Sequence, residues 1–261
     1  MNILATIAAH KRKEVAERKV LNPIAILEQS RFFKASPISL TKRLLSPGAS
    51  GIIAEFKRMS PSKGIINASA MVEEVTTGYL KAGATALSVL TDNRFFGGDK
   101  GDLLKARELN SSPILRKDFI VDPYQVIETK SIGADVILLI AAILTPEETL
   151  SLATLARSIG LETILEIHSH AELTHMNDQI SILGVNNRNL ASFTVSPDKS
   201  LSLSEMIPEG ILKISESGIR NPADVHLLRK SGYKGFLIGE LFMSTVDPAD
   251  ACQTFISELN K

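Results

Sequence analysis

Two charged side chains close the first long apolar run of the chain at a spacing that places them on one face of a strand. The segment 52–57 reads IIAEFK, so Glu55 and Lys57 are two residues apart. Side chains at positions i and i+2 of a strand point to the same side, whereas Ala54 and Phe56 must face the other way. A buried charged pair is costly unless it is neutralised or used in chemistry.

Later apolar runs end in polar groups of the same kind. These groups are Arg116, Lys117 and Asp118; Glu166; the segment 186–189 (NNRN); the segment 215–218 (SESG); and Gly239 with Glu240. Lysines and glutamates that converge on one cavity shift each other's pKa, as general acid–base catalysis requires. Each group alone has an ordinary structural explanation, and it is the convergence that indicates chemistry. Arg116 is expected to face away from Lys117.

The elements that would position these groups follow one repeating pattern of apolar run, loop and helical stretch. The runs are 51–55, 86–90, 114–117, 135–140, 162–166, 180–185, 211–215 and 236–238. Nearly continuous Val, Ile and Leu runs are typical of parallel strands covered on both faces. Eight such units predict an α/β fold, a closed (β/α)8 TIM barrel. An open doubly wound sheet is the alternative, but its usual G-x-G-x-x-G turn is missing.

Capping residues mark the expected helix boundaries. Thr145 precedes Pro146 and is followed three residues later by Glu148, the pattern of a capping box. Asp122 and Asn221 likewise precede prolines. Glycines fall where helices should end, at Gly83, Gly133, Gly160 and Gly232.

Residues 1–50 precede the first predicted strand and are expected to form an N-terminal helical extension of a single barrel domain covering 1–261. An apolar stripe predicts the first helix, a second helix is predicted over 23–33, and a short helical turn over 40–45. The extension could plug the N-terminal face of the barrel or cover the active-site face, and periodicity does not decide between them.

Composition argues against several classes of partner. Lys plus Arg and Asp plus Glu both number 29, so no net charge favours binding to nucleic acid or to an anionic membrane. The single cysteine, Cys252, excludes an intrachain disulfide and argues for a reducing, cytoplasmic setting. No apolar run approaches the ~20 residues that span a bilayer. No exposed apolar stripe demands a dimer, so a monomer without nucleic-acid or membrane partners is expected.

The remaining polar features carry less information. His168 and His170 have the spacing of a metal pair but no clear third ligand, so no metal site is predicted. His10, His175 and His226 are scattered over predicted helices, where surface positions are expected. The run 11–13 (KRK) is expected to be a solvated helix face.

Backbone groups near the last two strands are candidates for holding a phosphate. Gly218 and Gly239 follow the seventh and eighth runs, where barrels often bind phosphate through backbone N–H groups. Ser60 and Ser217 would add hydroxyl donors. Turn glycines are the ordinary alternative.

Two aromatic residues follow the second run, in the loop 94–99 (RFFGGD). Phe95 or Phe96 could stack on an aromatic substrate at the rim of the cavity, or could belong to the core.

These motifs resemble those of indole-3-glycerol phosphate synthases of tryptophan biosynthesis. The stretches that carry the resemblance are IIAEFKRMSPSKG (52–64), LSVLTDNRFFGGD (87–99), ILRKDFIVDPYQV (114–126), LETILEIHS (161–169), LGVNNRNL (183–190), KISESGI (213–219), FLIGELFM (236–243) and the leading helix ILATIAAHKRKEVAERK (3–19). They extend over nearly the whole chain. The resemblance implies a (β/α)8 barrel with an N-terminal helical extension, a phosphorylated small-molecule substrate, and no cofactor or metal.

The resemblance also implies a reaction and roles for residues. The substrate would be 1-(2-carboxyphenylamino)-1-deoxyribulose 5-phosphate, and the products indole-3-glycerol phosphate, CO2 and water. Lys117 would be the general acid, and Lys57 would contact the substrate carboxylate and serve as a second acid. Glu166 and Glu55 would take or stabilise protons, and which of them is the dehydration base stays open.

Further residues are implied to bind the substrate or intermediate. Asn186 and Ser217 would position the intermediate, while Ser60, Gly218 and Gly239 would hold the phosphate. The other implied contacts are Phe96, Phe119, Arg188 and Glu216. Glu240 is in doubt, because a carboxylate at a phosphate site is repulsive unless its side chain turns away.

Two rival functions are considered. Other phosphate-binding barrels of the pathway, the isomerase and the tryptophan synthase α subunit, place their acid–base groups differently from Lys57 and Lys117. A catalytically silent barrel should have lost Lys117 or Glu166, and both are present. The chain ends at Lys261, soon after the eighth predicted helix, so a fused isomerase barrel is not expected and a monofunctional protein is predicted.

Overall fold

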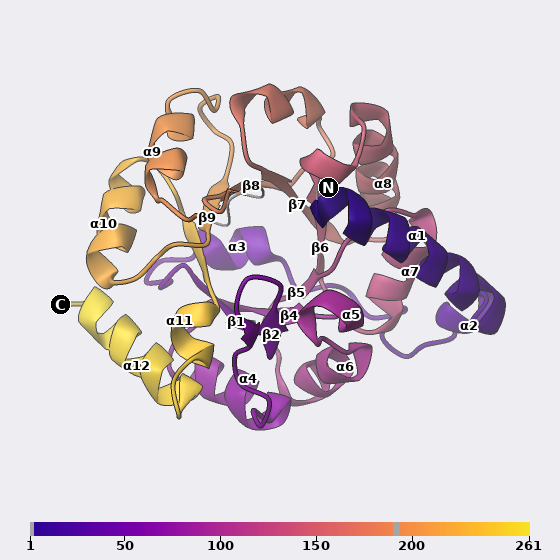
Figure 1. Cartoon of the computed structure of the whole chain (residues 1–261), viewed down its shortest axis with the longest axis horizontal. Helices are drawn as coiled ribbons and strands as arrows, with labels where there is room; N and C mark the ends of the chain where they lie inside the picture. Colours follow the sequence, from indigo (N-terminus) through magenta and orange to yellow (C-terminus); the bar gives the residue numbers. More distant parts are fainter. Residues whose placement is uncertain (1–2, 190–193) are drawn as a thin grey trace.

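The computed structural model describes residues 3–189 and 194–261. Within these ranges eight parallel strands close into a barrel, with helices around the outside (Figure 1). Strands that follow one another in the chain lie side by side, and the last, β10, pairs with the first, β1. The (β/α)8 TIM barrel predicted from the apolar runs is confirmed, and the open sheet is wrong.

The barrel strands begin and end within two residues of the predicted runs. They are β1 (Ile52–Phe56), β4 (Ala86–Leu90), β5 (Ile114–Lys117), β6 (Val136–Ile140), β7 (Glu162–Ile167), β8 (Ile182–Asn186), β9 (Lys213–Glu216) and β10 (Gly235–Ile238). A small antiparallel hairpin, β2 (Met59–Ser60) with β3 (Gly64–Ile65), follows β1.

The helices lie between the strands and begin where the capping residues predict. They are α4 (Val72–Lys81), α5 (Asn93–Phe96), α6 (Lys100–Leu109), α7 (Pro123–Ser131), η1 (Ala141–Ile143), α8 (Pro146–Ser158), η2 (His170–His175), α9 (Asp198–Ser204), α10 (Pro222–Lys230), α11 (Glu240–Met243) and α12 (Pro248–Leu259). Thr145 and Glu148 form the predicted capping box at α8. Within the described ranges no helix is long and apolar enough to cross a bilayer.

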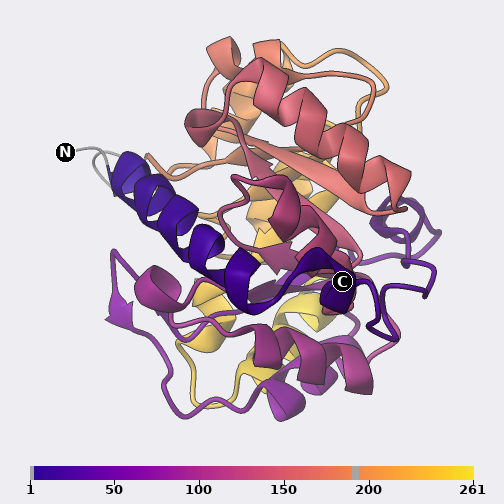
Figure 2. The ribbon, with the colours of Figure 1, turned by 90° about the vertical axis from the view of Figure 1, so that its right-hand side faces the viewer.

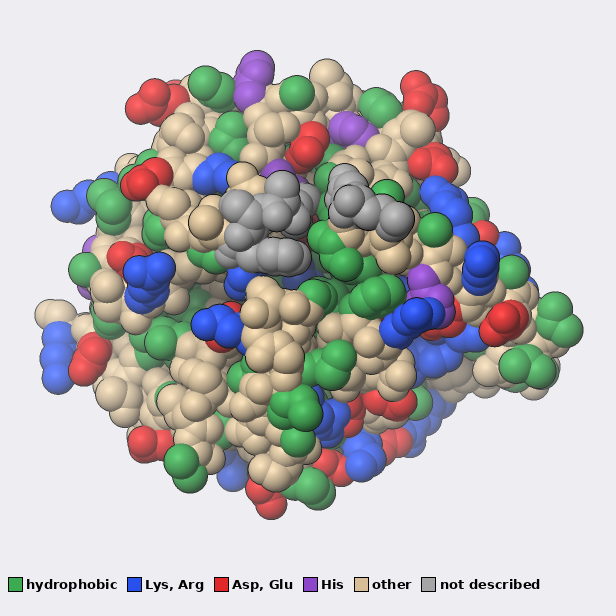
Figure 3. Space-filling model, viewed as in Figure 1, with side chains coloured by type: hydrophobic (Ala, Val, Ile, Leu, Met, Phe, Trp, Pro, Cys, Tyr) green, Lys and Arg blue, Asp and Glu red, His purple; other side chains and the backbone are tan. Residues whose placement is uncertain are grey.

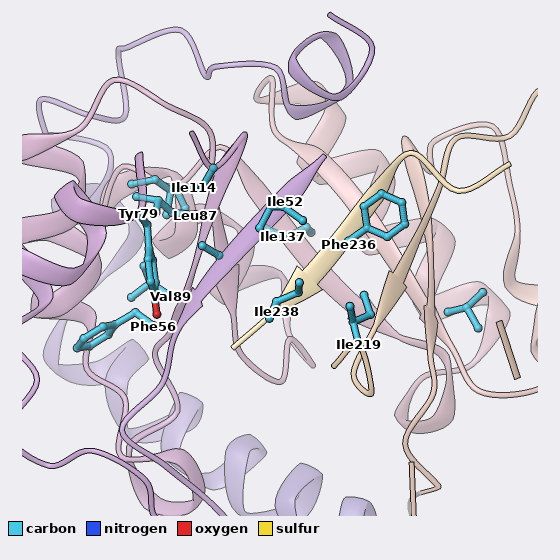
Figure 4. Packing of buried hydrophobic residues seen from close by; sticks show 14 of the residues in the cluster. Ile52, Phe56, Tyr79, Leu87, Val89, Ile114, Ile137, Ile219, Phe236 and Ile238 are labelled. Carbon is cyan, nitrogen blue, oxygen red and sulfur yellow. The ribbon is translucent and has the colours of Figure 1, made fainter. Parts of the chain in front are cut away.

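Alternating side chains of each strand build two separate cores. Residues such as Ile52, Leu87 and Phe236 point outward and pack under the helices (Figure 4). Residues such as Ile53 and Leu115 point inward and fill the barrel. Because the alternation continues to the strand ends, the inward positions at the carboxyl ends carry the charged groups.

The N-terminal extension contributes to both ends of the barrel. Leu4 and Ile7 of α1 (Ile3–Leu21) and Leu40 and Leu44 of α3 (Leu40–Leu44) all join the core inside the barrel. At the amino end of β7, Glu162 accepts hydrogen bonds from Ser39 Oγ at 2.5 Å and from the Thr41 N–H at 2.9 Å. Figure 2 shows α1 and the α3 segment on opposite sides of the barrel. The two alternatives are therefore both present in different helices: α1 covers the carboxyl ends of the strands, and α3 plugs the amino end of the barrel.

The second helix is shorter than predicted. Only α2 (Ile24–Leu27) is helical in the range 23–33, and the residues after it form turns. Ile24 and Ile26 are exposed and only Leu27 is buried. A longer helix would gain little tertiary packing, which is what stabilises most short helices in proteins.

The prediction that the run 11–13 is a solvated helix face is wrong for its first residue. Lys11 has 0% exposure, and its Nζ lies 2.8 Å from Asp92 Oδ2 and 3.0 Å from Asp118 Oδ1. Burial by itself lowers the pKa of Lys11, but the two carboxylates more than compensate and raise it. These ion pairs fasten α1 to the carboxyl ends of β4 and β5.

Arg116 faces away from Lys117 as expected, and it is fully buried beneath α7, where its guanidinium contacts Asp118 at 2.9 Å and Glu128 at 2.8 Å. The surface position expected for His175 is wrong: this residue is buried, with Nδ1 3.0 Å from Thr149 Oγ1. In both cases a polar partner on a neighbouring element makes burial possible.

Replacing Lys11 with methionine should destabilise the protein strongly, because Asp92 and Asp118 would remain buried without their cation. The expected loss in free energy of unfolding is about 3–5 kcal/mol, measured by chemical denaturation. Lys13→Met is the matched control, since Lys13 is exposed on the same helix, and it should change stability by less than about 0.5 kcal/mol. Equal effects of the two substitutions would contradict the anchoring role.

Candidate active site

The carboxyl ends of the strands surround a hollow in the face shown in Figure 3, where hydrophobic and basic side chains meet at its rim. The charged residues Glu55, Lys57, Lys117, Glu166 and Glu216 all line this main hollow. Each continues the inward-facing set of its strand, as Ile53 precedes Glu55 and Leu115 precedes Lys117. The predicted convergence of lysines and glutamates is therefore observed.

Lys117 is held between two carboxylates, one from β7, two strands away, and one from β9, on the opposite side of the barrel. Its Nζ lies 2.7 Å from Glu166 Oε2 and 2.8 Å from Glu216 Oε2. Asn186 donates a hydrogen bond of 3.1 Å from Nδ2 to the other oxygen of Glu166. The arrangement fixes an ammonium group and two proton acceptors within hydrogen-bonding distance.

Lys57, the second lysine, forms a separate ion pair with Glu55 beside the group around Lys117. Lys57 Nζ lies 2.8 Å from Glu55 Oε1, as the i, i+2 spacing predicts. Ser88 donates a weak hydrogen bond of 3.5 Å to the other oxygen of Glu55. The cluster formed by the two lysines and their partners thus contains two ammonium groups and three carboxylates.

Burial and charge act in opposite directions on the pKa values of this cluster. Burial by itself lowers the pKa of Lys117, but Glu166 and Glu216 raise it well above its ordinary value. Glu166 is also buried, yet Lys117 and then His168 lower its pKa to about 2. Burial is the largest influence on Glu216 and raises its pKa to about 7 despite the attraction of Lys117. The carboxylates flanking Lys117 therefore hold protons with very different affinities, as acid–base sites often require.

Apolar residues form one wall of the main hollow. Phe96 and Phe119 pack against each other with ring centroids 5.8 Å apart, and both line the hollow. Leu4 and Ile7 of α1 complete this wall. Phe95, the other aromatic considered from the sequence, packs against His10 instead. A flat apolar group fits against this wall beside the charged cluster.

A side hollow opens next to the main one, between the loops that follow β9 and β10. Ser217, Gly218, Gly239 and Arg188 are among its lining residues. Ser217 and Gly218 both have positive φ, at 65° and 79°. This left-handed conformation costs the serine free energy, and such strain tends to occur at functional sites.

The carboxylate of Glu240 also lines the side hollow, but it is paired with basic side chains. Its oxygens lie 3.4 Å from Lys63 Nζ and 3.5 Å from Arg188 Nη2. The repulsion expected from an isolated carboxylate is therefore reduced by two neighbouring cations.

Most residues predicted for the site border the two hollows. Ser60 is brought to the main hollow by the β2–β3 hairpin and does not line the side hollow with Gly218 and Gly239. Its Oγ lies 3.4 Å from Ser62 Oγ. Arg188 borders both hollows. Leu190, the last residue of one of the resembling stretches, lies outside the described residues.

Sequence reasoning left the contribution of the first helix open and missed that of one histidine. The apolar stripe that predicts the helix does not indicate that Leu4 and Ile7 line the main hollow. His168 was considered only as a metal ligand, whereas its ring lies beside Glu166. Its position two residues after Glu166 is the same i, i+2 signal that pairs Glu55 with Lys57. Among the described residues no group of three potential ligands could hold a metal ion.

Solved structures with the same architecture confirm the class of fold. Tryptophan synthase subunit α from Legionella pneumophila superposes with a TM-score of 0.61 at 15% identity, covering 84% of this chain and 96% of that chain. The 3-hexulose-6-phosphate synthase from Salmonella typhimurium gives a TM-score of 0.63 at 11% identity, covering 80% and 98%. At these identities the likeness concerns the fold alone. With the acid–base cluster at the strand ends, the chain belongs to the class of TIM-barrel enzymes.

Sequence comparison defines the family within that class. A family model described as indole-3-glycerol phosphate synthase matches residues 4–255. The indole-3-glycerol phosphate synthase of Bacteroides thetaiotaomicron is 47% identical over 259 residues, covering 99% of each chain. The synthase of a Polaromonas species is 41% identical over 254 residues, covering 96% of each. The chain belongs to the indole-3-glycerol phosphate synthase family, carboxy-lyases of tryptophan biosynthesis.

The raised pKa of Glu216 leads to a spectroscopic prediction. In the ligand-free protein a carboxyl group should be protonated below about pH 7 and ionised above it. Difference infrared spectroscopy should therefore show a carboxylic acid C=O band that is lost as the pH rises through neutrality. The band should be missing in Glu216→Gln and retained in the exposed control Glu258→Gln. A wild-type protein without this band would contradict the assignment.

Proposed function

We propose that this chain converts 1-(2-carboxyphenylamino)-1-deoxyribulose 5-phosphate into indole-3-glycerol phosphate, CO2 and water at the main hollow. The observation that carries the proposal is the placement of Lys117 between Glu166 and Glu216, beside the pair Lys57 and Glu55. Ring closure and dehydration each need a positioned acid, and dehydration also needs a base. The cluster supplies both kinds of group within one hollow.

Ring closure is the first step, and Lys117 is its proposed acid. The aromatic carbon that carries the carboxylate attacks the ketone carbon, and the ketone oxygen gains negative charge as the bond forms. An alkoxide is a stronger base than an amine, so a lysine with a raised pKa can still protonate it. The raised pKa also keeps Lys117 fully protonated before the substrate arrives.

Decarboxylation and dehydration follow. Loss of CO2 returns an electron pair to the cationic nitrogen system that ring closure creates. Dehydration then expels the former ketone oxygen as water and removes a proton from the adjacent CH2 carbon. Glu166 and Glu55 are the proposed proton acceptors, and Lys57 the proposed partner of the substrate carboxylate and second acid. Asn186 would position the intermediate through the same network, since it already donates to Glu166.

The two ends of the substrate match the two hollows. The aryl ring fits the wall that contains Phe96 and Phe119, and the phosphate fits the side hollow between Gly218 and Gly239. Ser217 and Arg188 border both hollows, so they would contact the part of the substrate between its aryl ring and its phosphate. Ser60 remains a proposed phosphate contact that would require the β2–β3 hairpin to approach the side hollow.

We include the wider organisation of the protein in this proposal. The chain would form one barrel domain over 1–261, with 1–50 as its helical extension, and would act as a monofunctional cytoplasmic monomer. Analytical ultracentrifugation tests the monomer directly, and a sedimentation mass of twice 28.3 kDa would contradict it.

Adding the substrate to the purified protein should produce a growing indole fluorescence signal, on a low background because the chain contains no tryptophan. Lys117→Ala should reduce kcat by about 10²–10⁴-fold, the usual contribution of a positioned acid. The control Lys34→Ala, an exposed lysine, should behave as the wild type. Activity retained in Lys117→Ala would overturn the role of Lys117, and an inactive wild type would overturn the function.

The phosphate assignment predicts a ligand-dependent gain in stability. Glycerol 3-phosphate should raise the Tm of the protein, whereas glycerol at the same concentration should not. At a ligand concentration of 100 Kd the stabilisation should approach about 2.7 kcal/mol. Identical Tm values with the two compounds would count against a phosphate site.

A further inference from the structure

His168 follows β7, and its ring lies between Glu166, which lines the main hollow, and Glu172. Its side chain is only 8% exposed, and Nε2 lies 3.3 Å from Glu166 Oε1. Nδ1 lies 3.7 Å from Glu172 Oε2. Neither ring nitrogen makes a hydrogen bond within the described part of the chain. A buried imidazole without a hydrogen bond is unusual and calls for an explanation.

Local structure aligns the three side chains in a row. His168 follows Glu166 by two residues at the end of β7, so it stays on the side of the strand that faces the hollow. Glu172 lies in η2, one turn later, where Oε2 accepts the backbone N–H of His168 at 2.6 Å. The Glu172 side chain is 21% exposed. The row therefore begins at the catalytic cluster and ends at solvent.

The proposed reaction needs such a connection because it takes up one proton in every turnover. The ketone oxygen leaves as water and must gain two protons. One comes from the CH2 carbon beside the nitrogen, and the other must come from solvent, since a carboxylate is lost as neutral CO2. The substrate itself would occupy the main hollow and displace water from Lys117, so a second route for this proton is useful.

We propose that Glu172 and His168 relay the proton from solvent to Glu166, and through it to Lys117. This inference rests on the proposed function. His168 contacts Glu166 and not the substrate, so it is a positioning residue. It also carries protons. Glu166 is suited to receive the proton, because one oxygen faces His168 and the other contacts Lys117 at 2.7 Å.

The transfer conserves every proton. Glu172 takes a proton from water and passes it to Nδ1, forming an N–H bond there as the Nε2–H bond breaks. The released proton forms an O–H bond on Glu166, and a half-turn of the carboxyl group brings it to the amine that Lys117 becomes after acting as the acid. Rotation of the imidazole resets its tautomer. The distance between His168 Nδ1 and Glu172 Oε2 shortens to that of a normal hydrogen bond when either side chain shifts by about 1 Å.

Other groups around His168 set its electrostatic environment. Glu166 on β7 and Glu172 on η2 face the ring directly. Lys199 on α9 is close enough to interact with both glutamates. Lys117 on β5 reaches the ring only through Glu166.

The test compares His168→Gln and Glu172→Gln with His170→Gln, an exposed histidine of the same segment, as the matched control. Each relay variant should lower kcat at least about 10-fold with KM changed less than about 2-fold. The solvent deuterium isotope effect on kcat should increase, and added imidazole should restore part of the activity of His168→Gln. The control should match the wild type in all of these quantities.

Two outcomes overturn the relay while leaving the proposed function intact. One is a wild-type kcat in His168→Gln. The other is a reduced kcat without a larger isotope effect or imidazole rescue, which would mean a purely structural role. An inactive wild type would instead refute the function itself.

Nitrogen NMR of the ligand-free protein tests the contact between His168 and Glu172 independently of activity. The ring-nitrogen shifts of His168 should change in Glu172→Gln, and unchanged shifts would overturn the relay.

Discussion

The structure depends on the neutralisation of charges that are buried at the carboxyl ends of the barrel strands. A charged group leaves water only at a large free-energy cost, so each must find an opposite charge nearby. Lys117 pairs with Glu166 of β7 and Glu216 of β9, and Lys11 of α1 pairs with Asp118. The partners come from distant parts of the sequence, so the same pairing that makes burial tolerable also assembles the site.

This constraint gives three consecutive residues different roles. Arg116, Lys117 and Asp118 are consecutive, and the strand alternation sends Lys117 into the hollow and the other two toward the helices. Arg116 and Asp118 then belong to a closed network that includes Glu128 of α7 and Lys11 of α1. Lys117, the proposed acid, therefore projects from a strand end that is fixed by ion pairs on its outer side, which keeps its position rigid.

Features with a local cause could be predicted from the sequence, and features with a distant cause could not. Continuous apolar runs defined the strands, and the i, i+2 rule paired Glu55 with Lys57. The burial of Lys11 depends on Asp92 and Asp118, which no local pattern connects to α1. Likewise, whether the extension covers or plugs the barrel depends on the surfaces against which α1 and α3 pack. The length of the second helix depended on packing that periodicity does not report.

The large sequence separation between α1 and the residues that it contacts has a consequence for folding during synthesis. Arg12 donates a hydrogen bond to the backbone oxygen of Val121, a residue 109 positions later, and Lys11 depends on Asp118 in the same region. Contacts between such distant residues carry a high loop-closure cost and form late. As the ribosome releases the chain, the first helix must wait in solvent until the third barrel strand has emerged. Its abundant basic and acidic side chains keep it soluble during that wait, so the charged face serves the nascent chain as well as the finished enzyme.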